Sequence, residues 1–243
     1  MNHNTRLAQT FIGLMIVAGI GSTIWAGATS HTLHLSYALA VAALAAVTSR
    51  MKVKFPGING TMSVNMPFFL IAVVNLSAVE AVAIACISTV VQCWPKPDAK
   101  FKPMQMLFNV SMMACAASMA SLLWHSNWLG HSAWASEPLM LASATATFFL
   151  GQTAPVAGII TLTEGIALRR IWMSLAQLSF PYYVLSAGVT SMVNVISHHT
   201  GWQFALAAFP VMYGIYKSFQ LYFGSASGSP VRRILSRSAG AGM

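Results

Sequence analysis

Long apolar runs, separated by short polar stretches, occupy most of this chain of 243 residues. A helix that crosses the hydrocarbon core of a bilayer needs about 20 apolar residues, at about 1.5 Å of rise per residue. Runs near this length predict membrane helices over 8–27, 34–49, 64–94, 104–125, 138–163, 171–197 and 202–223. The first run is close to spanning length, so we expect it to remain in the protein rather than to be a cleaved signal peptide.

Segment 64–94 is too long for one straight crossing. Its 31 residues would form a helix of roughly 46 Å, against a hydrocarbon core of about 30 Å. A turn signal lies at its middle, where Ser77 and Glu80 have the spacing of a capping box. We therefore predict two short helices, 64–76 and 78–94, in a hairpin that is either re-entrant or thinly spanning. Thr200 and Gln203 have the same spacing and predict a second capping box at the start of the last helix.

The basic residues indicate how the chain is oriented in the membrane. The loops 28–33, 126–137 and 198–201 contain no Lys or Arg. Because basic loops stay in the cytoplasm, both termini are predicted to be cytoplasmic, and segment 64–94 must enter and return. All 13 basic residues fall in five places, namely Arg6; Arg50, Lys52 and Lys54; Lys96, Lys100 and Lys102; Arg169 and Arg170; and Lys217, Arg232, Arg233 and Arg237.

The predicted architecture is an all-α membrane protein. It has six long transmembrane helices plus the short hairpin, which gives up to eight membrane segments. Residues 1–223 form one polytopic domain, and 224–243 form a flexible basic cytoplasmic tail.

Composition supports a bilayer as the solvent of this chain and excludes several other classes. The chain is 56% hydrophobic and 7% charged, whereas soluble domains carry about 25% charged residues. The net charge of +9 does not indicate a nucleic-acid-binding protein, because the basic residues alternate with apolar runs and form no polar face. The three cysteines, Cys86, Cys93 and Cys115, lie inside apolar runs without metal or disulfide spacing and are interpreted as packing residues. The expected location is a bacterial inner membrane.

The four acidic residues argue against transport coupled to ions. Asp98 and Glu164 fall in cytoplasmic loops, Glu137 in an external loop and Glu80 at the hairpin tip. Pumps and ion-coupled antiporters need ionisable groups near the bilayer midplane. Lys217 has no carboxylate partner in a helix, so we interpret it as a snorkelling side chain rather than a retinal-binding lysine. Nothing in the sequence indicates hydrolytic, redox or phosphotransfer catalysis, and we expect no enzyme activity and no cofactor.

Histidines gather on the predicted external side, where six of the seven are found. One hypothesis is an external metal site formed by His31, His34, His198 and His199. The alternative is that histidine tolerates the interface where Lys and Arg are excluded. No metal motif is present, and the second interpretation is preferred.

Prolines at a shared depth indicate a candidate ligand pocket. Pro155, Pro181 and Pro210 lie near the middle of the last three predicted helices, and an interior proline frees a backbone carbonyl four residues earlier. Such kinks would open a cavity for a small neutral or amphipathic molecule. The alternative is that these polar groups only bond neighbouring helices. The candidate ligand-binding residues are Gln152, Thr153, Tyr182, Tyr183, Tyr213, Asn109 and Glu80.

Several stretches, taken in order, resemble bacterial membrane sensor modules of the MASE type. The resemblance covers about residues 40–223. It is carried by Phe55 to Ser63, Glu80, Val91 to Trp94, Gln105 to Asn109, Glu164-Gly165, Ser179 to Tyr183, Gly201 to Gln203 and Tyr213 to Ser218.

The resemblance implies a sensor without catalysis in the membrane. Such modules precede phosphodiesterase, cyclase or histidine kinase domains, whereas here the last helix gives way at Gly224 to a short tail. We therefore expect a non-enzymatic sensory or ligand-binding module that acts through a separate cytoplasmic or membrane signalling partner. The sequence does not decide between a monomer and a homo-oligomer. Pro56-Gly57 and Thr61 to Ser63 also resemble the substrate-binding components of energy-coupling-factor transporters. A vitamin-type uptake subunit and a structural subunit of a membrane complex are the alternatives.

A reporter inserted between residues 95 and 103 is expected to lie in the cytoplasm, because Lys96, Lys100 and Lys102 fall there. A reporter inserted in 126–137 is expected in the periplasm. Paired phosphatase and fluorescent-protein fusions measure both positions. A periplasmic signal from the first insertion would refute the folding-back of 64–94.

Overall fold

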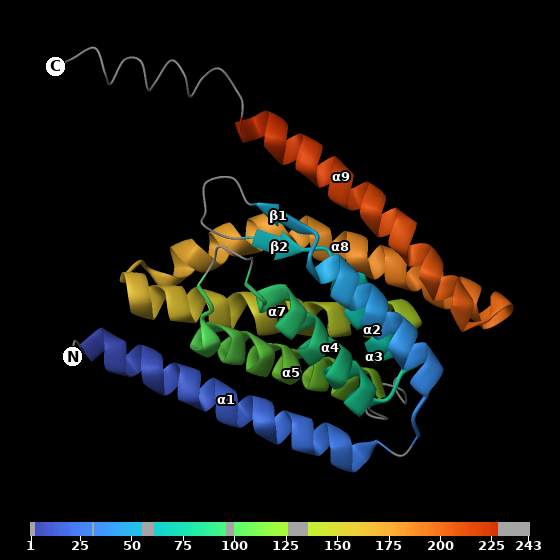
Figure 1. Cartoon of the computed structure of the whole chain (residues 1–243), viewed down its shortest axis with the longest axis horizontal. Helices are drawn as coiled ribbons and strands as arrows, with labels where there is room; N and C mark the ends of the chain where they lie inside the picture. The colour runs from blue at the N-terminus through green and yellow to red at the C-terminus, as the bar shows by residue number, and fades with distance from the viewer. Residues whose placement is uncertain (1–2, 31, 55–60, 96–99, 126–135, 228–243) are drawn as a thin grey trace.

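The computed structural model describes residues 3–30, 32–54, 61–95, 100–125 and 136–227. Helices dominate it, as the apolar runs predict (Figure 1). In chain order the elements are α1 (His3–Thr29), α2 (Leu35–Ser49), β1 (Lys52–Lys54), β2 (Thr61–Ser63), α3 (Met66–Asn75), α4 (Ala78–Cys93), α5 (Pro103–His125), α7 (Glu137–Glu164), α8 (Leu168–Thr200), the 3₁₀ helix η1 (Trp202–Ala207) and α9 (Ala208–Ser227).

The predicted hairpin is confirmed as two helices, α3 and α4. Leu76 and Ser77 separate them, and Ser77 and Glu80 form the predicted capping box. Every residue of α3 from Met66 to Val73 is buried. A helix that is apolar all round is expected to lie inside a protein rather than at its surface, and α3 packs against α2, α4, α5 and α8.

Two predictions about the last helix are wrong. Gly201 has φ +93° and ends α8, and Thr200 Oγ1 donates back to Ile196 O at 2.9 Å, so Thr200 does not cap the next helix. A 3₁₀ segment then precedes α9, which shifts the start of the α-helix to Ala208. Pro210 therefore lies in the first turn of α9 and not at its middle. A proline in the first turn sacrifices no helical hydrogen bond.

A two-stranded antiparallel ribbon was not predicted. Strands β1 and β2 pair Lys52 with Ser63 and Val53 with Met62, and Val53 is buried. Each strand has three residues, which is too short for alternation to stand out in the sequence. The ribbon joins α2 to α3, and Ser63 Oγ donates to Ser49 O at 2.9 Å.

Small residues let the helices around α5 approach closely. Helix α5 packs against α1, α4 and α7. A Cβ atom at Gly19 of α1 would lie 2.6 Å from Ser111 Cβ, and one at Gly151 of α7 would lie 2.9 Å from Ala116 Cβ. Such contacts are typical of membrane helices, whose association depends on close packing rather than on the hydrophobic effect.

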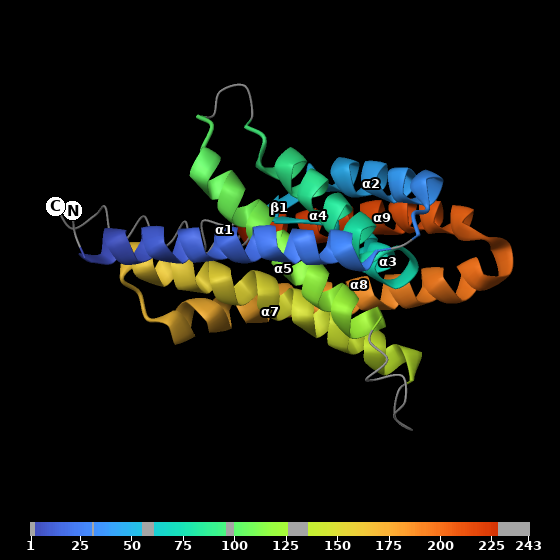
Figure 2. The ribbon, with the colours of Figure 1, turned by 90° about the horizontal axis from the view of Figure 1, so that it is seen from below.

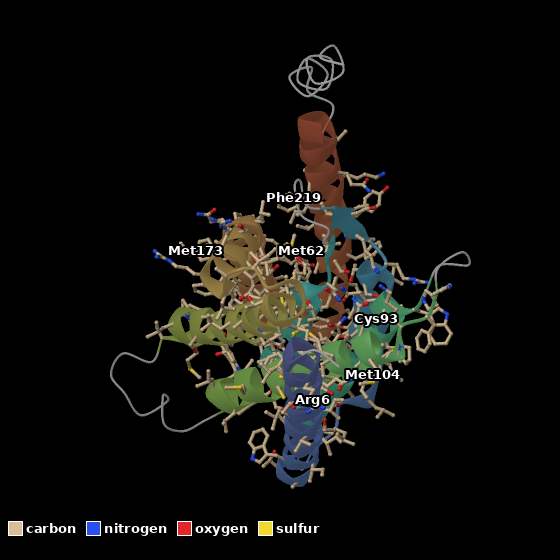
Figure 3. The ribbon with its side chains drawn as sticks, turned by 90° about the vertical axis from the view of Figure 1, so that its left-hand side faces the viewer. Arg6, Met62, Cys93, Met104, Met173 and Phe219 are labelled. Atoms are coloured by element: carbon tan, nitrogen blue, oxygen red, sulfur yellow. The ribbon has the colours of Figure 1, made fainter. Side chains whose placement is uncertain are left out.

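The bundle has two chemically different ends (Figures 1 and 2). One end holds the start of α1, the end of α9 and the connections from α4 to α5 and from α7 to α8; we call it the basic end. It carries the described residues Arg6, Arg50, Lys100, Lys102, Arg169 and Arg170, and Figure 3 looks onto it. The opposite, distal end holds the α1–α2 connection, the α3–α4 tip and the turn into η1.

Length and composition identify membrane-crossing helices only in part. Within the described ranges, Arg6–Thr29, Pro103–His125 and Glu137–Glu164 are long and apolar enough to cross a bilayer, and α2, α3 and α4 are shorter apolar helices. Six long crossings and a cytoplasmic location of the termini therefore stay predictions.

The substitution Gly19→Ala is expected to destabilise the bundle by about 1–3 kcal/mol, because the new methyl group overlaps Ser111. Gly13→Ala is the matched control: it lies on the same helix with nothing within 4 Å of its Cβ position, and alanine favours a helix by about 1 kcal/mol over glycine. Thermal unfolding of both variants in mild detergent measures the difference. Equal melting temperatures would contradict the close crossing of α1 and α5.

Candidate functional site

The buried start of α3 brings two of the predicted site residues together. Tyr182 of α8 accepts a hydrogen bond at its hydroxyl from Met66 N–H at 2.8 Å. Gln152 of α7 places its Nε2 3.8 Å from the sulfur of the same Met66. Two of the helices that carry the predicted pocket residues therefore meet at the first residue of α3.

Backbone groups at the start of α3 find hydrogen-bond partners in the protein that lipid could not provide. Of the first residues of α3, Met66 donates to Tyr182, Pro67 has no N–H, and Phe68 N–H donates to Asn65 O at 3.1 Å. The carbonyl of Pro67 accepts from Thr190 Oγ1 at 3.3 Å. A helix that begins inside a bundle needs such partners, because no water is available there.

The polar residues next to this point are also engaged by protein. Thr153 Oγ1 donates to Phe149 O at 2.6 Å and accepts from Trp172 Nε1 at 3.2 Å. Tyr183 is buried and meets the ring of Phe149 edge-on, with centroids 5.2 Å apart. The bond from Trp172 of α8 to Thr153 of α7 agrees with the alternative in which the polar groups bond neighbouring helices. The predicted midplane pocket stays a proposal.

The remaining predicted residues lie elsewhere. Asn109 Nδ2 is 3.4 Å from Cys93 Sγ, close to the basic end. Tyr213 is 47% exposed on α9, with Lys217 Nζ 5.6 Å from its ring centroid. Pro155 and Pro181 lie inside α7 and α8 as predicted, whereas Pro210 does not share their position. Glu80 is at the distal end.

Glu80 is a buried carboxylate that joins the hairpin tip to the α1–α2 connection. Its side chain is 6% exposed. Oε1 accepts from His34 N–H at 2.6 Å, and Oε2 accepts from Ser77 N–H at 3.0 Å and Ser77 Oγ at 2.7 Å. Val79 N–H also donates to Ser30 Oγ at 3.0 Å. Hydrogen bonds from fixed donors offset the cost of burying the charge.

A cavity of about 510 Å³ lies beside this junction at the distal end. It is bordered by the last turns of α1, α3 and α5, by the start of α4 and by the α1–α2 connection. Sequence analysis did not predict it, because helix ends far apart in the chain meet only in three dimensions. Its lining residues are Trp25, Thr29, Ser30, Thr32, His34, Val74, Asn75, Leu76, Ser77, Ala78, Ser121, Leu122 and His125.

A second, smaller cavity of about 110 Å³ lies on the other side of the hairpin tip. It is lined by Tyr37, Asn75, Asn194, Ser197 and Trp202, so Asn75 borders both cavities. The hydroxyls of Tyr37 and Ser197 are buried and have no hydrogen-bond partner in the described protein. The ring of Tyr37 packs on that of Trp202, with centroids 5.4 Å apart, and Asn194 Nδ2 donates to the Glu137 carboxylate.

The hypothesis of an external metal site gains no geometric support within the described residues. No group of three or more histidine, cysteine or acidic side chains gathers in that part of the chain. His34 borders the larger cavity and His199 is exposed. His31 and the side chain of His198 lie outside the described residues.

The sequence of this chain matches a known protein family. A family model named MASE9 matches residues 29–223. The chain belongs to the MASE9 family. MASE families are membrane sensor modules, so the resemblance noted in the sequence is confirmed, and no output domain lies in the matched range. No curated protein and no solved structure matches this MASE9 chain.

In this MASE9 module, Tyr182→Phe is expected to lower the stability by about 1–3 kcal/mol, because it leaves the buried Met66 N–H without its acceptor. Tyr213→Phe is the matched control, since Tyr213 is exposed and the substitution keeps its ring beside Lys217. Chemical unfolding in detergent, followed by tryptophan fluorescence, measures both. If the two variants lose equal stability, Tyr182 does not hold the start of α3.

Proposed function

We propose that this chain is a non-enzymatic sensory module of a bacterial inner membrane. A small molecule binds to the membrane part, and the resulting rearrangement is detected at the basic end by a separate signalling protein. The observation that carries the proposal is membership of the MASE9 family over residues 29–223. The confinement of the basic connections to one end supports a fixed orientation in the membrane, with that end in the cytoplasm.

The packing of α9 supports its role as the moving element. Helix α9 begins through η1 beside the smaller cavity, where Trp202 packs on Tyr37. From there it returns toward the basic end and lies at the edge of the bundle (Figures 1 and 3). Its contacts with the rest of the protein are mainly to η1 and β1. An element with few packed contacts changes position at low cost.

The hairpin tip provides a route from the ligand to α9. Asn75 borders both cavities, and two buried hydroxyls that line the smaller cavity have no hydrogen-bond partner among the described residues. A ligand that favours one position of the tip would change the packing of Tyr37 and Trp202 and thereby shift α9. The contacts of Gln152 and Tyr182 with Met66 would carry the same movement to α7 and α8.

Purification of the full chain from its own membranes in mild detergent is expected to retain a cyclase, a phosphodiesterase or a histidine kinase. Mass spectrometry identifies the proteins and small molecules that are retained. Co-purification of a transmembrane coupling protein with ATPases would contradict the proposal and indicate an uptake subunit. Retention of neither class would indicate a structural subunit.

The control variant replaces residues 228–243 with a shuffled sequence of the same composition. If the partner recognises the tail, capture is lost in the shuffled variant as well as in a deletion of the same residues. Capture that survives the deletion would show that the partner reads another part of the basic end.

A further inference from the structure

The larger distal cavity lies where the negative ends of several helices converge. Its wall includes the last turn of α1 with Trp25 and Thr29, the last turn of α3 with Asn75, and the last turn of α5 with Ser121 and His125. A helix C-terminus carries the equivalent of about half a negative charge, and its last carbonyls have no partner within the helix. Three such ends favour a positively charged ligand over an anion.

The opposing helix starts do not cancel this field. Helices α2 and α4 begin at the same end, and the N–H groups at a helix start favour anions. Glu80 already occupies this position: its carboxylate accepts from His34 N–H, just before α2, and from Ser77 N–H, just before α4. The hydrogen bonds to the Glu80 carboxylate come from His34 and Ser77, and the connecting loops 28–33, 126–137 and 198–201 contain no Lys or Arg.

The cavity also offers an apolar wall and a polar group without a partner. Trp25 and Leu122 supply aromatic and aliphatic surface, and an indole face attracts cations. Ser121 is 1% exposed, and its hydroxyl has no hydrogen-bond partner in the described protein. Buried hydroxyls are normally satisfied, so an unpaired one in the cavity wall points to a ligand or solvent that completes the site.

We propose that this cavity binds a small amphipathic organic cation, an amine or quaternary ammonium compound. The charged group lies among the ends of α1, α3 and α5 beside Glu80, and the apolar part lies against Trp25 and Leu122. The inference rests on the proposed sensory function and names the position and chemical class of its ligand.

The test uses the full chain in phosphatidylcholine nanodiscs and three probes of similar size: benzyltrimethylammonium, benzyl alcohol and benzenesulfonate. Isothermal titration calorimetry against empty nanodiscs measures the affinities. We expect saturable binding of the cation, at least about tenfold tighter than that of the neutral and anionic probes. Comparable binding of all three probes, tighter binding of the sulfonate, or no saturable binding of the cation overturns the proposal.

Matched variants locate the bound cation. Glu80→Gln removes the charge beside the cavity and is expected to weaken cation binding about tenfold, whereas Glu137→Gln removes a carboxylate at the same end, outside the cavity, and is expected to leave it unchanged. If Glu80→Gln does not fold, the comparison of Trp25→Leu with Trp94→Leu decides, since Trp94 is exposed near the basic end. Equal effects within either pair overturn the assignment.

The outcome separates this inference from the sensory function. Capture of a signalling protein without cation binding would overturn the proposed cation site and support the sensory function. Cation binding without capture of a signalling protein would support the cation site and contradict the sensory function.

Discussion

The buried hairpin α3–α4 depends on finding a protein partner for each backbone group that lipid would leave unsatisfied. Helix α3 begins inside the bundle, where its first N–H donates to Tyr182, its second residue is a proline, and its third N–H donates to Asn65. At the other end of the hairpin, the Glu80 carboxylate accepts the N–H groups that precede α2 and α4. Because an unpaired backbone group in hydrocarbon costs several kcal/mol, these few contacts decide whether the hairpin can lie where it does.

Charged side chains form different kinds of hydrogen bond at the two ends of the bundle. The distal end contains carboxylates that are hydrogen-bonded by backbone or amide donors rather than by basic residues. At the basic end, Arg50 and Lys52 donate to carbonyls at the end of α4, those of Val91, Trp94 and Gln92. Basic side chains there complement a helix C-terminus, and the predicted orientation of the chain in the bilayer rests on the same residues.

Much of the fold was predictable because lipid imposes a minimum length on apolar runs. The predicted segments 34–49 and 104–125 differ from α2 and α5 by one residue at most. The hairpin followed from the basic clusters on both sides of 64–94 together with the Ser77–Glu80 spacing. The ribbon of β1 and β2 and the 3₁₀ segment at Trp202–Ala207 were missed, since both are too short to leave a periodic pattern. The predicted depth of Pro210 was wrong because the 3₁₀ segment moves the start of the last α-helix to Ala208.

The site was harder to predict than the fold. Depth along the helices predicted that Gln152 and Tyr182 border one pocket, but it could not show that both reach Met66. The distal cavity is formed by helix ends that are up to about a hundred residues apart in the chain, so no local sequence motif predicts it. Glu80 was recognised as a cap, whereas its bond to His34 depends on how α1 and α2 are joined.

Helix α1 has an unusual position in this molecule. The family match begins at residue 29, so nearly all of α1 lies outside the region that defines the family. Yet Trp25 forms part of the wall of the larger cavity, and Gly19 fixes the helix closely against α5. If the larger cavity binds the proposed ligand, part of its wall comes from a helix that the family match does not cover. A substitution at Trp25 would then alter the chemical selectivity of this chain without changing any residue of the matched region.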